Sequence, residues 1–443
     1  MATSSEEQAA KDIVSVPIDA VPSGSTATAI AAHDHSKTKK VVTIMSSLYS
    51  IWRRIIVFNI LAIIFVPLGI ISFVLKWGDI PTFVLNVCAI IPLAKLLDYS
   101  TDQLSMRVGQ TIGGLLNATF GNAIELIVSI LALRKGELRV VQASLIGSVL
   151  SNLLLVLGFC FLCGGLFPSD KSATLLDRFQ LLDPDQANLN IGLLSVVFLG
   201  FIIPAAFHIA SEQTIGFNAE EIASKTLSIS RGTAIVLLVT YIAFLIFQLY
   251  SHRGETRVVS EPVPDVERVD APAAAIEEEE EEEEEAETLA IIAVGALVCV
   301  TVVIGFCAEF LVDSLDGLAK QASISKTFIG IIILPIVGNA AEHVTAVSAA
   351  MRNKMNLVIS VAVGSSIQIS LLVAPVLVLI GWMIGQNLSL DFEIFESVVL
   401  FVTIFVTSTL ISDGRTNWLE GWMLLASYVI LAIAFYYTTD VAE

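Results

Sequence analysis

The chain has 443 residues, of which 55% are hydrophobic and 15% charged, with a formal net charge of −19. A soluble protein carries about 25% charged residues, so this composition excludes a soluble enzyme and a secreted disulfide scaffold. Fifteen of the 43 acidic residues lie between Glu255 and Glu287, and the rest of the chain offers no basic face for a nucleic acid. The apolar residues come in blocks long enough to cross a bilayer, which predicts an all-α polytopic membrane protein.

Residues 1–54 are expected to form a disordered cytosolic N-terminal tail with a basic end. The segment is polar and lacks the apolar core of a secretory signal. Its last part carries Lys37, Lys39, Lys40, Arg53 and Arg54 ahead of the first apolar block. Positive charge before a first span favours a cytosolic N-terminus.

Eleven membrane spans are predicted after this tail. They lie at about 55–76, 80–97, 109–133, 139–165, 190–211, 232–250, 289–313, 324–351, 356–384, 395–411 and 418–437. Residues 251–288 form an acidic loop that contains nine consecutive glutamates, the pattern of a solvated segment. Because six spans precede this loop, it should lie on the same side as the N-terminus, in the cytosol.

An internal repeat divides the chain. The segment GNAIELIVS at Gly121–Ser129 matches GNAAEHVTA at Gly338–Ala346, and the offset of 217 residues continues without a gap over 36 positions with 11 identities. Residues 55–250 then contain the first span plus one five-helix repeat, and residues 289–443 contain the second. Because five is odd, the two repeats have opposite orientations, as in many alternating-access transporters.

Glu125 and Glu342 occupy the same position of the two repeats, inside the third and eighth predicted spans. A carboxylate at membrane depth costs at least about 2.5–3.5 kcal/mol and indicates function by default. The alternative is a structural carboxylate paired with Lys or Arg. No such residue lies within two helical turns of either glutamate in its own span.

The neighbouring residues favour a cation site. Asn122 and Asn339 lie three residues before the glutamates, on the same helical face. Carboxylate, amide and hydroxyl oxygens suit Ca²⁺, which takes about six to eight oxygen ligands. For the serines, close helix packing is the alternative. The expected metal-ligating residues are Glu125, Glu342, Asn122, Asn339, Gln368, Ser148, Ser151 and Ser365.

The same two carboxylates predict proton coupling. They cannot both stay ionised in a low-dielectric cavity without a cation, so Ca²⁺ and protons should exclude one another. The expected proton-coupling residues are Glu125, Glu342 and His343, although His343 also fits a core histidine bonded to backbone. Asp102 and Glu309 are candidate carboxylates of an access path, and plain interfacial charge is the alternative for both.

These motifs resemble a known family. GNAIELIVS, GNAAEHV, the two GS pairs with Ser148 and Ser365, SRGT at Ser230–Thr233 and the acidic loop are similar to the cation/proton exchangers of the calcium:cation antiporter superfamily, most of all the fungal vacuolar Ca²⁺/H⁺ exchangers. The resemblance implies eleven spans, a vacuolar membrane and exchange of cytosolic Ca²⁺ for luminal H⁺. It also implies that Glu125 and Glu342 are the central ion-binding carboxylates, accompanied by Asn122, Asn339, His343 and Gln368.

The leading hypothesis is therefore a Ca²⁺/H⁺ antiporter that works by alternating access and is not an enzyme. No cofactor is expected, since Ca²⁺ and H⁺ are transported substrates, and the lipid bilayer is the expected surrounding. A Mn²⁺/H⁺ or other divalent cation exchanger is the alternative on the same fold. A passive cation channel is the alternative from another class, and uphill transport distinguishes it. The sequence leaves the oligomeric state open.

Overall fold

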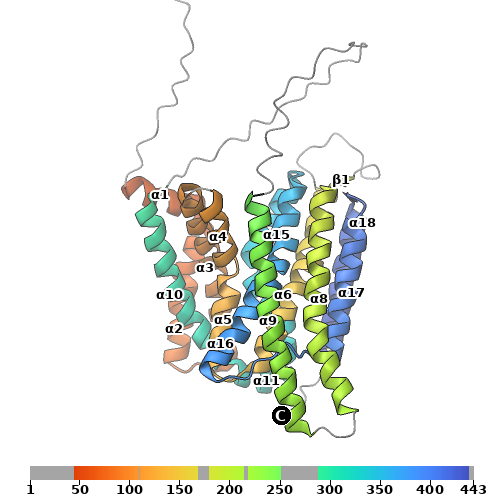
Figure 1. The fold of residues 1–443 in the computed structure, drawn as a ribbon. Coiled ribbons are helices and arrows are strands. Elements are labelled where there is room, and N and C mark those ends of the chain that lie inside the picture. The colour runs from red at the N-terminus through yellow and green to blue at the C-terminus, as the bar shows by residue number, and fades with distance from the viewer. Residues whose placement is uncertain (1–43, 109, 168–178, 214–217, 251–287, 439–443) are drawn as a thin grey trace, which may run out of the picture. The chain divides into compact units, whose positions relative to one another are not determined.

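The structure, a computed structural model, describes residues 44–108, 110–167, 179–213, 218–250 and 288–438 (Figure 1). These residues belong to one compact unit, Val42–Glu443. The tail up to residue 43 and the acidic loop from 251 to 287 lie outside the described residues. Helices make up nearly all of the described part, beside one short antiparallel pair in which β1 (Gln180–Leu181) contacts β2 (Arg415–Thr416).

The first half of the chain forms one set of helices. They are α1 (Ile44–Arg54), α2 (Ile56–Val74), α3 (Asp79–Val108), α4 (Gln110–Phe120), α5 (Ala123–Arg134), α6 (Leu138–Leu150), the π-helix η1 (Ser151–Val156), α7 (Leu157–Leu166), α8 (Pro184–Glu212) and α9 (Ala219–Tyr250). The amide of Asn59 donates to the carbonyl of Ile51 (3.0 Å), which ties the end of α1 to α2.

The second half forms the matching set. It comprises α10 (Ala290–Asp313), α11 (Leu315–Ala322), α12 (Lys326–Phe328), the π-helix η3 (Ile329–Ile333), α13 (Leu334–Gly338), α14 (Ala340–Met351), α15 (Met355–Gln368), the π-helix η4 (Ile369–Val373), α16 (Ala374–Ile384), α17 (Ile394–Ile411) and α18 (Trp418–Tyr436).

The helices confirm a polytopic membrane fold but not the expected count of eleven spans. Within the described residues, nine helices are long and apolar enough to cross a membrane, or ten if α11 and α12–α13, bent by 115°, form one span. The predicted spans 109–133 and 324–351 are each divided. One is split into α4 and α5, and the other is split between α13 and α14. Both divisions fall at the Gly-Asn pair of the repeat motif.

The predicted disordered tail, residues 1–54, extends too far along the chain, because Ile44–Arg54 forms α1. The physical reason is an amphipathic pattern. The apolar side chains of Met45, Tyr49 and Trp52 recur at helical spacing and are all exposed. The helix therefore lies outside the main apolar core, and hydropathy over a long window does not detect it.

The two halves share local helix irregularities. The π-helix η1 begins at Ser151 and η4 begins at Ile369, within one residue of the 217-residue offset. The breaks at Asn122 and Asn339 follow the offset itself. π-segments are frequent at functional sites, and these two flank the same region of the fold.

Glycine lets the halves approach closely. A Cβ atom at Gly147 in α6 would overlap the backbone of Ile331 in η3, and one at Gly330 would lie 2.6 Å from the Cβ of Ala143. Small residues that allow such backbone contact are the usual basis of helix association in membranes. The α6–η3 contact packs the first half against the segment of the second half that leads to the break at Gly338.

The long helices have two ends that can be recognised in Figure 1, the α1 end and the α11 end. At the α1 end, the Arg107 side chain of α3 donates to the carbonyl of Thr288, just before α10 (2.7 Å). At the α11 end, Gln321 of α11 donates to Asp79 at the start of α3 (3.1 Å). Thus α3 and α10 run antiparallel, and residues along either helix can be assigned to the α1 end or to the α11 end.

Candidate cation site

Both glutamates of the repeat motif lie at the start of a half-helix. Glu125 is in the first turn of α5, directly after the break at Gly121-Asn122. Glu342 is in the first turn of α14, directly after the break at Gly338-Asn339. The unpaired amides of a helix N-terminus favour negative charge. The glycine-asparagine breaks therefore create two N-termini inside the membrane region, each next to a carboxylate.

The two carboxylates approach one another across the halves. Glu125 is buried, with 7% of its surface exposed. A Cβ atom at Gly338 would lie 2.5 Å from Glu125 Oε1, so the bare glycine allows this carboxylate to reach the break between α13 and α14. Glu342 lies within electrostatic range of Glu125 and also of Asp98 in α3. Two like charges thus face one site from opposite repeats.

A chain of side-chain hydrogen bonds joins the halves beside this pair. Asn122 Nδ2 donates to Gln368 Oε1 (2.7 Å), and Ser365 Oγ donates to Asn122 Oδ1 (3.1 Å). Asn152 Nδ2 donates in turn to Ser365 Oγ (3.0 Å). The Ser365 hydroxyl also lies near the carboxyl group of Glu342. The network holds polar oxygens from α5, α14 and α15 in one place.

Several polar atoms of the site have no protein partner. Within the described residues, Ser148 Oγ, Glu342 Oε2 and both side-chain polar atoms of Asn339 are buried without a hydrogen bond. A buried polar group left unpaired costs about 1–3 kcal/mol. The oxygens among them, Ser148 Oγ, Asn339 Oδ1 and Glu342 Oε2, come from both halves and are available as ligands to a cation.

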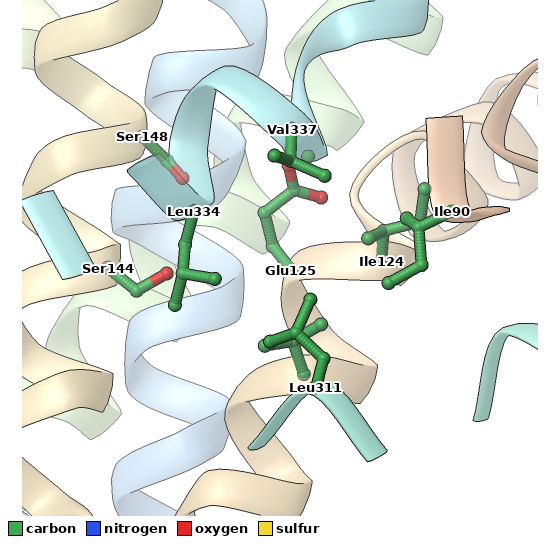
Figure 2. A pocket seen from close by; sticks show the side chains of 10 residues that line it. Ile90, Ile124, Glu125, Ser144, Ser148, Leu311, Leu334 and Val337 are labelled. Carbon is green, nitrogen blue, oxygen red and sulfur yellow. The ribbon is translucent and has the colours of Figure 1, made fainter. Parts of the chain in front are cut away.

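Figure 2 shows Glu125 projecting into a pocket with Ser144 and Ser148 on one side. The other walls are apolar and come from both halves: Ile90, Ile124, Val128, Leu311, Leu334 and Val337, with Gly338. Ionised Glu125 is expensive against such walls unless a proton or a cation compensates it. Leu311 lies near the α11 end of α10, and Val128 lies almost one turn beyond Glu125 in that direction along α5, so the pocket extends from Glu125 toward the α11 end.

Three predicted residues have other surroundings. Ser151 lies in η1, which packs against α18, and its Oγ is buried without a hydrogen-bond partner among the described residues. Asp102 lies in α3 toward the α1 end, whereas Glu309 lies in α10 toward the α11 end. The structure therefore does not bring Asp102 and Glu309 together, and the weak sequence parallel between them has no counterpart in space.

His343 makes the contact expected of a core histidine. Its Nδ1 lies 2.7 Å from the carbonyl oxygen of Asn339, one turn earlier in α14. Its Nε2 is buried without a partner among the described residues. The backbone contact fixes the ring beside Glu342, and its role in proton coupling stays a prediction.

Sequence reasoning missed three residues of this region. Asn152 lies one turn after Ser148, and that spacing on a shared face was the available signal. Lys95 and Asp98 are charges near the middle of α3, and their depth in an apolar helix was the signal. Lys95 Nζ lies 2.6 Å from Asp98 Oδ2 and donates to Thr345 Oγ1 of α14 (3.0 Å).

The donor set can hold a hard cation. No group of three His, Cys, Asp or Glu side chains suitable for a metal is present in the described residues. A cation here would instead be held by two carboxylates and by neutral amide and hydroxyl oxygens. Ca²⁺ accepts this mixture, and two charges can be matched by protons when the ion leaves.

The fold and the site define a polytopic helical membrane protein with two inverted repeats that meet at a pair of carboxylates. The family model described as sodium/calcium exchanger protein matches residues 79–250 and 292–437, and the chain belongs to this family.

Individual relatives cover most of the chain. It is 43% identical to a "Vacuolar calcium ion transporter" of Schizosaccharomyces pombe, over 86% of this chain and 84% of the relative. It is 37% identical to a "Ca(2+)/H(+) antiporter" of Aphanothece halophytica, over 86% and 96% respectively. Among solved structures, native YfkE superposes with a TM-score of 0.68 at 34% identity, and the match covers 86% of this chain and all of that one.

Proposed function

We propose that this chain is a Ca²⁺/H⁺ antiporter of the vacuolar membrane that moves cytosolic Ca²⁺ into the vacuole in exchange for luminal protons. The vacuolar calcium ion transporter of Schizosaccharomyces pombe and the Ca(2+)/H(+) antiporter of Aphanothece halophytica support the substrates and the membrane. The observation that carries the mechanism is the meeting of Glu125 and Glu342 across the two halves.

The carboxylate pair carries both substrates in turn. Without a cation, the two glutamates cannot both remain ionised at low dielectric, so protons neutralise them. Ca²⁺ supplies the same compensating charge when it binds, with oxygens of Asn122, Asn339, Gln368, Ser148 and Ser365 completing its shell. Bound Ca²⁺ and bound protons therefore exclude one another, and this exclusion couples their movements.

Orientation follows from charge and from the repeat. The basic segment before α1 supports a cytosolic N-terminus and a cytosolic acidic loop, and in this orientation the α1 end faces the cytosol and the α11 end faces the lumen. Glu342 is then nearer the cytosolic approach, and the pocket at Glu125 extends to the luminal side. Rearrangement of the inverted halves, 55–250 and 289–443, exposes the pair alternately to the two sides.

The test is ⁴⁵Ca²⁺ uptake into sealed proteoliposomes with an acidic interior and a K⁺/valinomycin clamp. Uptake against a Ca²⁺ gradient that stops when a protonophore collapses the pH gradient supports the proposal. Glu125→Gln and Glu342→Gln should each abolish uptake while the protein still inserts. Glu221→Gln is the matched control, because that carboxylate lies at the surface and pairs with Lys225 within α9. Uptake that ignores the pH gradient contradicts antiport.

A further inference from the structure

A lysine and an aspartate lie near the middle of α3, where the apolar stretch of the helix ends. Lys95 is 19% exposed and Asp98 is 38% exposed, and their ammonium and carboxylate are 2.6 Å apart. Charged residues at membrane depth are costly and mark ion pathways or their counter-ions. A pair within one helix, three residues apart, adds little stability by itself. Stability therefore does not explain why both charges are present.

The pair is connected to the central carboxylates. Asp98 is within electrostatic range of Glu342, so it is a third acidic group near the site. Lys95 also donates to Thr345 Oγ1 (3.0 Å), which lies three residues after Glu342 in α14. Like α3, α14 runs toward the α1 end, because Gln180 Nε2 donates to the carbonyl of Ala350 near the end of α14 (3.0 Å), and β1, which contains Gln180, lies at the α1 end (Figure 1). The pair thus lies on the α1 side of Glu342.

We propose that Asp98 is an outer cation-binding carboxylate on the approach to Glu342, and that Lys95 is its built-in counter-ion, displaced by the incoming divalent cation. This inference rests on the proposed Ca²⁺ transport. Without Ca²⁺, the ammonium neutralises Asp98 and limits the negative charge near Glu342. When Ca²⁺ arrives, its two charges replace the single charge of Lys95 at Asp98. Thr345 remains a partner for the released ammonium.

The charges of Lys95 and Asp98 determine the apparent affinity of the protein for Ca²⁺. An unscreened Asp98 would bind Ca²⁺ more firmly and slow its onward movement to Glu342. An uncompensated Lys95 would repel the cation from the same approach. The two single substitutions should therefore change the apparent affinity in opposite directions, which a purely structural bridge between α3 and α14 would not do.

The experiment measures KM and the maximal rate of ⁴⁵Ca²⁺ uptake in full-length protein in proteoliposomes. For Asp98→Asn we expect KM to rise at least tenfold, because the cation loses one carboxylate charge on its approach. For Lys95→Gln we expect KM and the maximal rate to fall. The double variant Lys95→Gln/Asp98→Asn should return KM to within about threefold of the wild-type value, and Lys95→Arg should keep it there.

Opposite KM shifts that the double variant cancels support the proposal. Equal KM in both single variants, or a shift in the same direction, overturns it and leaves the pair a structural contact. If Asp98→Asn fails to fold, Lys95→Gln against Lys95→Arg decides the matter, since only the loss of charge should lower KM. Wild-type protein without pH-driven uptake overturns the proposed function itself. Active wild type with unchanged KM in the variants overturns only the inference.

Discussion

Gly338→Ala tests how closely the two halves must approach at the central carboxylates. The new Cβ atom would lie 2.5 Å from Glu125 Oε1 and 3.2 Å from its Cδ, whereas real Cβ atoms essentially never come within 3.0 Å of another heavy atom. The carboxylate oxygen must therefore retreat by about half an ångström. Because it is the far end of a flexible side chain, the retreat costs little folding free energy.

The functional cost of this retreat should be much larger than the folding cost. A displacement of about 1 Å in a reacting or binding group can cost about 100-fold in rate. For about half that displacement we expect the KM for Ca²⁺ to rise about tenfold, with a midpoint of thermal unfolding close to that of the wild type.

The assay combines Ca²⁺ uptake in proteoliposomes with thermal unfolding of the detergent-purified protein. Gly305→Ala in α10 is the matched control, because a Cβ atom there would have no neighbour from another helix of the described residues within 4 Å. This control should leave KM unchanged and stabilise the helix by about 0.5–1 kcal/mol. A Gly338→Ala protein with wild-type KM would show that Glu125 is not positioned by this contact, and the reasoning would fail.

Two further substitutions test the polar contacts between helices. Asn122→Ala removes the amide that donates to Gln368 and accepts from Ser365. The two groups left without a partner should lower the free energy of unfolding by about 1–3 kcal/mol and raise the KM for Ca²⁺. An unchanged midpoint of thermal unfolding would contradict this expectation. Arg139→Gln removes the guanidinium that pairs with Glu396 at 2.6 Å, and the Glu396 side chain is fully buried. An unpaired buried charge costs about 3–5 kcal/mol, so thermal unfolding of Arg139→Gln should show a loss of stability of this size. The double variant Arg139→Gln/Glu396→Gln should recover part of that stability. Equal losses of stability in the single and the double variant would refute the expectation.

Much of this molecule could be predicted from local sequence. Apolar blocks indicated the spans, because a helix that crosses the hydrocarbon core of a bilayer needs about 20 predominantly apolar residues. The 217-residue offset placed Glu125 and Glu342 in equivalent positions. The Gly-Asn pairs marked the two helix breaks, since glycine destabilises a helix interior and asparagine competes for backbone hydrogen bonds. These signals act over one or two turns of helix, and sequence reports them directly.

Which residues of a helix point toward the candidate cation site depended on the tertiary structure. Ser151 belongs to the predicted ligand set by sequence, but it lies where η1 packs against α18, and its Oγ makes no hydrogen bond within the described residues. Asn152, its neighbour, joins the network at Ser365. In a membrane helix the lipid-facing and protein-facing sides are both apolar, so hydropathy does not reveal the rotation of a helix about its axis. A π-helix such as η1 shifts that rotation further, because it adds a residue to a turn.

The partner of a charge is also a tertiary property. Lys95 and Asp98 were visible as charges in an apolar segment, but their relation to Thr345 and Glu342 joins residues about 250 positions apart. The membrane class, the repeat and the two central glutamates could be read from the amino-acid sequence, because each follows from local composition or from internal identity. Only the packing of α3 against α14 decided which charges meet, because contacts between distant helices depend on the shape of the whole bundle.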